Sequence, residues 1–153
     1  MQTAEPKQLK RLIAKFNQLY IQTRNKYLIQ FPNRYITINK KRSSRAIALN
    51  DSMIKTHLSG ELTYGVFNGG YFNKFITFDV DFHENTLARW ATLKLIDVLV
   101  TEFNINRRDI HVSLSGGKGY HVDLFFSRPV PAKTAEQFFT KVVTSAGDLC
   151  GGK

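Results

Sequence analysis

The chain has 153 residues, of which 42% are hydrophobic and 12% aromatic, and this composition is typical of one globular domain or most of one. No apolar run approaches the roughly 18 residues that a membrane span requires, and the single Cys150 excludes an internal disulfide framework or a zinc site of several cysteines. The first residues lack the basic and then apolar pattern of a secretory signal, so we expect the chain to stay in the cytoplasm.

The net charge of +10 is unevenly distributed along the sequence. Residues 1–74 carry 13 Lys and Arg against 3 Asp and Glu, whereas residues 75–153 carry nine of each kind. We therefore divide the chain into a basic N-terminal unit, residues 1–74, and a neutral core, residues 75–153. A basic surface attracts polyanions, so the first unit is a candidate for nucleic-acid binding, with a solvated surface as the competing interpretation.

The basic unit opens with an amphipathic helix over residues 6–20, for which Pro6 suits the first turn. Its expected buried face repeats at helical spacing and comprises Leu9, Leu12, Ile13, Phe16, Leu19 and Tyr20. Residues 34–39 read as a strand that runs into the densest basic cluster of the chain: Lys40, Lys41, Arg42 and Arg45. We expect this cluster to be a loop that contacts phosphates, although an ordinary solvated charge run explains it equally well.

Two further elements precede the neutral core. Residues 49–58 weakly favour a helix, and residues 62–67 favour a short strand. Asn68-Gly69-Gly70 is a strong turn signal, so we expect a hairpin that pairs this strand with the next one. Such a hairpin would place Tyr64 and Phe67 near the acidic residues described next.

The apolar run over residues 75–82 reads as a buried strand that carries two carboxylates, Asp79 and Asp81. Side chains alternate across a strand, so both carboxylates share one face. The other face points into a core and carries Phe78, Val80 and Phe82. Adjacent carboxylates repel each other unless a cation lies between them, and Mg²⁺ or Mn²⁺ prefers such oxygen ligands. The pair is therefore a candidate metal site, while two solvated aspartates at a strand end are the plain alternative.

The remaining elements follow in the order β-α-β-β-α. The expected ranges are a helix from residue 85 or 86 to 103, strands at 110–114 and 120–126, a break at 127–131, and a helix over about 133–144. Asn85 or Thr86 is the expected helix cap. This is the split βαβ pattern of RRM-like domains without its final strand, so we expect an α+β fold with an RRM-like core. The chain stops at residues 151–153, where that strand should begin, which indicates a fragment or a different closing element.

The stretch Ser115-Gly-Gly-Lys-Gly-Tyr-His121 is a second candidate site. Glycines allow backbone N–H groups to approach an anion closely, and we expect Ser115 and His121 to face each other across the hairpin with Lys118 nearby. The spacing is not that of a Walker A loop, and a strand follows it instead of a helix. A glycine-rich hairpin with an incidental lysine is the competing interpretation.

The combination of these motifs resembles the archaeo-eukaryotic primase superfamily, which includes primase-polymerases of plasmids, phages and defence systems. Asp79-Val-Asp81 matches its acidic first motif, and Ser115 with His121 matches its second motif around a glycine-rich turn. The third motif, an acidic residue on a later strand, is not found, and Asp123 and Asp148 are poor substitutes. The match covers roughly residues 34–145.

The resemblance implies a DNA primase-type nucleotidyltransferase that transfers NTP or dNTP units onto a strand copied from single-stranded DNA. By this resemblance, Asp79 and Asp81 are the catalytic residues that bind Mg²⁺ or Mn²⁺. The residues that bind the triphosphate are Ser115, Gly116, Lys118 and His121. The template would contact Lys40, Lys41, Arg42 and Arg45. A helicase or another replication or defence domain is the expected neighbour in a full-length protein, and no membrane partner is expected. His83 is expected to cap its loop, with a contact to the metal or to a phosphate as the alternative.

A non-catalytic RRM-like module that binds single-stranded nucleic acid would share the fold and the charge. Such modules bind bases through exposed aromatic side chains on central strands, whereas this strand carries aspartates that repel phosphates without a metal. A rolling-circle replication initiator is set aside because His111 and His121 each lack a second histidine at the required spacing. The order of elements also disfavours an Asp-x-Asp glycosyltransferase.

Overall fold

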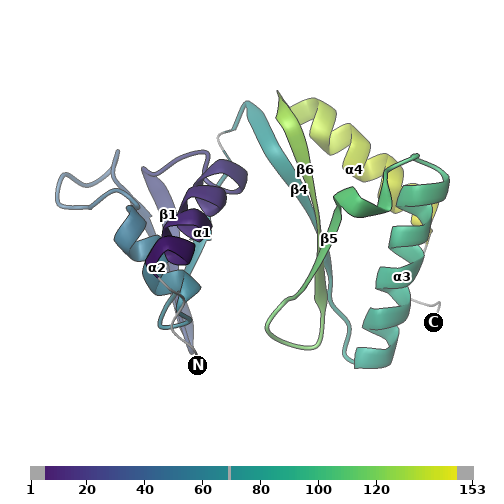
Figure 1. Ribbon diagram of the computed structural model, residues 1–153, viewed down its shortest axis with the longest axis horizontal. Coiled ribbons are helices and arrows are strands. Elements are labelled where there is room, and N and C mark those ends of the chain that lie inside the picture. Colours follow the sequence, from purple (N-terminus) through teal and green to yellow (C-terminus); the bar gives the residue numbers. More distant parts are fainter. Residues whose placement is uncertain (1–5, 69, 148–153) are drawn as a thin grey trace. The chain divides into compact units, whose positions relative to one another are not determined.

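The computed structural model describes residues 6–68 and 70–147, which form two compact units that divide after Gly70. Each unit has its own three-stranded antiparallel sheet with helices, so the expected α+β class is confirmed (Figure 1). Gly69, Asp148, Cys150 and residues 151–153, on which expectations were stated, lie outside the described residues. None of the described helices combines the length and apolar character that a membrane crossing demands.

The first unit contains two helices and three strands. In chain order these are α1 (Pro6–Leu19), β1 (Lys26–Phe31), β2 (Arg34–Asn39), α2 (Asp51–Leu58) and β3 (Thr63–Val66). The strands lie in the order β2-β1-β3 and all pairs are antiparallel. The central strand β1 occupies a mixed apolar stretch that the sequence pattern leaves unassigned. Helix α2 begins after Asn50, whose side chain caps it by accepting a hydrogen bond from the Met53 N–H.

The core of the first unit lies between the helices and one face of this sheet. Tyr27 of β1 is buried together with Ile21, Leu49 and Ile54, and Phe16 of α1 packs against them. The other strand residues of this face are partly buried against the same cluster: Ile29, Ile38, Tyr64 and Val66. The expected buried face of α1 is wrong at Leu12, which is 45% exposed.

Arg24 joins the two helices of the first unit. Its guanidinium donates hydrogen bonds to the carbonyl oxygen of Leu49 at 2.8 Å, to Asn17 Oδ1 on α1 at 2.6 Å, and to Asp51 Oδ1 on α2 at 2.8 Å. Hydrogen bonds from Arg24 and then Asn17 hold the pKa of the Asp51 carboxyl below its usual range.

The second unit contains one sheet with both α-helices on the same face. Its elements are β4 (Phe72–Val80), α3 (Asn85–Thr101), a short 3₁₀ helix (Arg107–Asp109), β5 (Ile110–Leu114), β6 (Tyr120–Pro131) and α4 (Ala132–Ala146). The strands lie in the order β4-β6-β5. Both neighbouring pairs are antiparallel, so β4 and β5 run parallel with β6 between them, and α3 is the crossover of a split βαβ unit (Figure 1).

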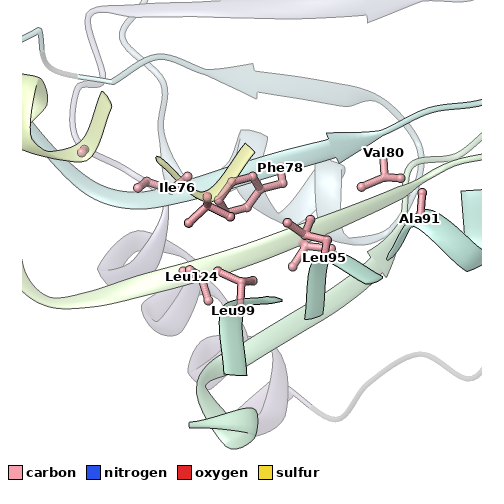
Figure 2. Close-up of a cluster of buried hydrophobic side chains, with 10 residues drawn as sticks. Ile76, Phe78, Val80, Ala91, Leu95, Leu99 and Leu124 are labelled. Atoms are coloured by element: carbon pink, nitrogen blue, oxygen red, sulfur yellow. The ribbon is translucent and has the colours of Figure 1, made fainter. Parts of the chain in front are cut away.

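A continuous apolar cluster joins this sheet to its helices (Figure 2). Phe78 and Val80 of β4 are buried in it, and Phe82 packs against it, as the alternation over residues 75–82 predicts. Leu95 and Leu99 of α3 approach the same strands from the helix side (Figure 2). The other members are Ile76, Ala91, Val122, Leu124, Ala135 and Val142. This packing fixes which face of β4 turns away from the helices.

The expected hairpin across residues 68–70 is wrong. Strand β3 pairs with β1, and β4 pairs with β6, so the turn signal joins two units instead of two neighbouring strands. Tyr64 packs against Tyr27, and Phe67 lies below the ammonium of Lys26, both within the first unit. The reason is that β3 packs its apolar side chains into the core of the first unit and pairs there with β1. The sequence pattern does not identify β1 as a strand.

Two smaller expectations are also wrong. The N-cap position of α3 is Glu84, which makes no side-chain cap hydrogen bond, so neither Asn85 nor Thr86 is the cap. The expected break over residues 127–131 is instead the last part of β6, where the register with β4 shifts between Asn73 and Phe75. Such an irregularity lets a strand continue past prolines, which cannot donate to a regular ladder.

His57 gives the first unit a predicted pH dependence. Its Nδ1 accepts a hydrogen bond from the Tyr64 N–H at 3.3 Å, its ring packs against Phe16, and burial lowers its pKa below the ordinary value of 6.5. The unfolded chain therefore binds more protons than the folded unit as the pH falls through about 6.5. We predict that stability declines from pH 7.5 to pH 5 and that His57→Gln reduces this decline, measured by urea unfolding.

His83→Gln is the matched control, because the side chain of His83 is exposed. An equal pH dependence of the native protein and His57→Gln would contradict the prediction.

Candidate functional site

The open face of the β4-β6-β5 sheet brings together three polar residues from three strands. Asp79 on β4 pairs directly with His121 on β6, which in turn pairs with Ser113 on β5. Directly paired residues share a face, and the neighbours of Asp79 and His121 along the chain, Val80 and Val122, are buried on the opposite side. His121 Nε2 lies 3.5 Å from Asp79 Oδ1, which makes an ion pair when the imidazole is protonated.

Asp81 lies just beyond the end of β4, and the glycine-rich loop packs closely against it. A Cβ atom placed on Gly119 would lie 2.5 Å from the Val80 carbonyl oxygen and 3.2 Å from Asp81 Oδ1. Any side chain at position 119 would therefore push the loop away from the carboxylate. The sequence motifs, separated by more than 30 residues, meet at this point of the structure.

The loop itself is a tight connection between β5 and β6. The Ser115 N–H donates to the Gly119 carbonyl at 3.1 Å, and Gly116 adopts a φ of +89°, a conformation that favours glycine. The Lys118 ammonium donates to the backbone carbonyl of His83 at 3.2 Å. That contact places a cation of the loop beside the segment that follows Asp81.

The expected pairing of Ser115 with His121 is wrong. The strand register places Ser113 opposite His121, and Ser115 lies two residues further along, at the mouth of the loop. The correct pairing of Ser113 with His121 could be predicted from the sequence. A turn with Gly116, Gly117 and Lys118 at its tip pairs residue 115 with residue 119. Counting back along both strands from that pair reaches residues 113 and 121.

A second polar row lies next to the first on the same face. Thr77, Asp123 and His111 are paired across β4, β6 and β5, and the Thr77 hydroxyl donates to Asp123 Oδ1 at 2.6 Å. Asp123 is only 6% exposed, whereas Asp79 is exposed. The Asp123 carboxylate is therefore shielded from solvent within the sheet, in contrast to that of Asp79.

The expected template contacts belong to the first unit. Lys40, Lys41, Arg42 and Arg45 are all exposed in the loop between β2 and α2. The side chain of Asn39, the last residue of β2, accepts a hydrogen bond from the Lys41 N–H and fixes the start of this loop. The cluster is thus a loop that presents cations to solvent, as expected.

A comparison with protein-family models matches residues 13–150 to the family described as TOTE conflict system, Archaeo-Eukaryotic Primase domain. The chain belongs to this family. The match includes residues of both structural units. A comparison with curated proteins found no match.

Few acidic side chains of the described part of the domain are placed where a metal ion could bind. Within residues 6–68 and 70–147 no group of three or more His, Cys, Asp and Glu side chains is placed to hold a metal ion. Two exposed carboxylates, Asp79 and Asp81, remain as the donors of the first motif. A pair of carboxylate donors fits a hard divalent cation such as Mg²⁺, which commonly takes its other ligands from substrate phosphates and water.

We predict that Gly119→Ala destabilises the primase-type domain by about 1–3 kcal/mol, because the added methyl group overlaps backbone atoms that cannot rotate away. Gly117→Ala is the matched control, since an added Cβ there meets nothing within 4 Å. Urea unfolding measures both changes. Equal stability of the two variants would show that the loop does not pack on Val80 and Asp81 as described.

Proposed function

We propose that this primase-type domain transfers nucleotides from NTP or dNTP onto a strand that is copied from a single-stranded DNA template. The observation that carries the proposal is the packing of Gly119 on Asp81, which brings the acidic first motif and the glycine-rich second motif to one place. Family membership supports the general class of the domain, and this geometry supports the reaction.

In the proposed reaction, a hydroxyl oxygen of the growing strand forms a bond to the α-phosphorus of the bound nucleotide. The bond from that phosphorus to the bridging oxygen breaks, pyrophosphate leaves with the bonding electrons, and the hydroxyl proton passes to solvent. Asp79 and Asp81 would hold Mg²⁺ or Mn²⁺. A bound divalent ion supplies Lewis-acid activation of the attacking hydroxyl and neutralises charge on the leaving pyrophosphate.

The second motif would hold the triphosphate. Gly116 and Gly119 keep the backbone of the loop compact, and Lys118 carries the positive charge that a triphosphate requires. His121 adds a donor beside Asp79, within 3.5 Å of its carboxylate. Ser115 lies at the mouth of the same loop, with its N–H already bonded to Gly119, so its hydroxyl is the group proposed to contact phosphate.

The exposed loop with Lys40, Lys41, Arg42 and Arg45 would contact phosphates of the template strand. Contacts of this kind position the strand without reading its sequence. The context of a conflict system supports further domains as partners of the full-length protein. A helicase or another replication or defence domain would supply or process the single strand that this domain copies.

We predict that the chain binds a labelled nucleoside triphosphate only with Mn²⁺ or Mg²⁺, and that Asp79→Ala with Asp81→Ala weakens this binding at least tenfold. Loss of the carboxylates removes the cation that screens the triphosphate. Isothermal titration with and without Mn²⁺ measures the effect. The control is Asp97→Ala with Glu136→Ala, which removes the same charge from exposed positions on α3 and α4.

Metal-independent nucleotide binding, or an equal loss in the control variant, would contradict the polymerase-type site. Absence of nucleotide binding together with tight binding of single-stranded DNA would instead favour a non-catalytic nucleic-acid-binding module.

Replacing Lys40, Lys41, Arg42 and Arg45 by Gln is predicted to weaken binding of a single-stranded oligonucleotide. Each lost phosphate contact lowers the slope of log K against log salt by about 0.7 for single strands, so the slope should fall by about two to three. The control exchanges an equal number of cations on α1, namely Lys7, Lys10, Arg11 and Lys15. Equal slopes for the two variants would show that the loop makes no specific contribution.

A further inference from the structure

The first unit has a sheet face that its own core does not use. Tyr27 and Ile29 of β1 point into the core, so Leu28 and Gln30 point to the opposite face. The strand register adds the partners of these residues on β2, namely Thr37 and Tyr35, to the same face. This open face of the β2-β1-β3 sheet therefore has a defined set of side chains.

One end of the open face presents an aromatic ring to solvent. Tyr35 pairs with Gln30 and is 71% exposed, which is unusual for an aromatic residue on a strand. Leu28 follows in the next row on β1 and extends over Gly65 of β3, where an added Cβ would lie 2.5 Å from Leu28 Cγ. Because Gly65 has no side chain, the Leu28 side chain can lie flat along the sheet. It forms a flat apolar surface beside Tyr35.

The other end of the face is cationic. The Lys26 ammonium lies 4.2 Å from the centre of the Phe67 ring, which holds the charge over this end by a cation–π contact. Asn39, the partner of Lys26 on β2, fixes the start of the loop that carries Lys40 and Lys41. Four residues of strand separate the row of Tyr35 from the row of Lys26, a span of about 13 Å.

The charge of this face is complementary to a polyanion. Strands β1, β2 and β3 contain no Asp or Glu. The open face of the second sheet, by contrast, carries Asp79 and Asp123. An exposed ring, hydrogen-bonding side chains and cations at one end are the groups that bind an unpaired nucleic-acid strand, in which bases stack and phosphates are neutralised.

We propose that the open face of the β2-β1-β3 sheet binds a single nucleic-acid strand, with a base stacked on Tyr35 and phosphates near Lys26 and the Lys40–Arg45 loop. The strand's role as a template rests on the proposed function, but the binding surface itself does not. Stacking on one ring is tolerant of base identity, because every base has an aromatic face. The site therefore holds a strand of any sequence.

The test measures binding of a fluorescein-labelled oligodeoxythymidylate to the full chain by fluorescence anisotropy. Loss of one base–aromatic stack weakens binding about five- to a hundredfold, so Tyr35→Ala should show this loss and Tyr35→Phe should not. Trp90→Ala is the control, since it removes a different solvent-exposed aromatic ring, on α3 of the second unit. Urea unfolding of each variant verifies that the first unit is folded.

The same variants are then tested with a duplex of equal length and with Mn²⁺ and a nucleoside triphosphate. The proposal expects Tyr35→Ala to leave both of these affinities unchanged, because duplex bases are already stacked and the nucleotide site lies in the other unit. Oligonucleotide binding that is absent, or that Tyr35→Ala and Trp90→Ala weaken equally, overturns the proposal. Oligonucleotide binding that depends on Tyr35 supports the proposal, whatever the result for the nucleotide site. If Asp79→Ala with Asp81→Ala has no effect on nucleotide binding, that result contradicts only the proposed catalytic function.

Discussion

The antiparallel pairing of β4 with β6 is the constraint on which the candidate site depends. It buries Ile76, Phe78 and Val80 beneath the helices. Because side chains alternate along a strand, Asp79 then points to the open face. The same register places His121 opposite Asp79 and carries β6 back to Gly119, which rests on the Val80 carbonyl. The apolar core therefore positions the polar groups. No polar contact of the site has to hold the carboxylate in place by itself.

The elements of the neutral core were largely predictable, because each depends on local pattern. Alternation identified the buried side of β4, and the glycine cluster identified the connection between β5 and β6. The failures share a different cause. The sequence pattern leaves β1 unassigned and predicts a hairpin at residues 68–70, because the partner of β3 lies far back in the sequence. Proximity in the chain predicts that Ser115 faces His121, whereas the strand register places Ser113 opposite His121. Which strands pair with each other depends on the tertiary structure, and the strand propensity of a segment does not predict it.

The two sheets of the protein share one architecture but differ in the charge of their open faces. Each covers one face with helices and leaves the other face open. The open face of the second sheet concentrates carboxylates, which suit a cation, while that of the first sheet has none and is bordered by lysines. The two open faces therefore differ in the charges that their strands carry. The family match covers both sheets.

The long separation of β4 from β6 also has a consequence for folding. The hairpin of β5 and β6 closes a short loop, whereas Asp79 and His121 are joined only after a chain of about forty residues, including α3, has been enclosed. Closing the longer loop costs more conformational entropy, so the turn between β5 and β6 can form before β4 pairs with β6. The two motifs come together only when β4 pairs with β6. A chain arrested before that step has a folded turn and no acidic partner for it.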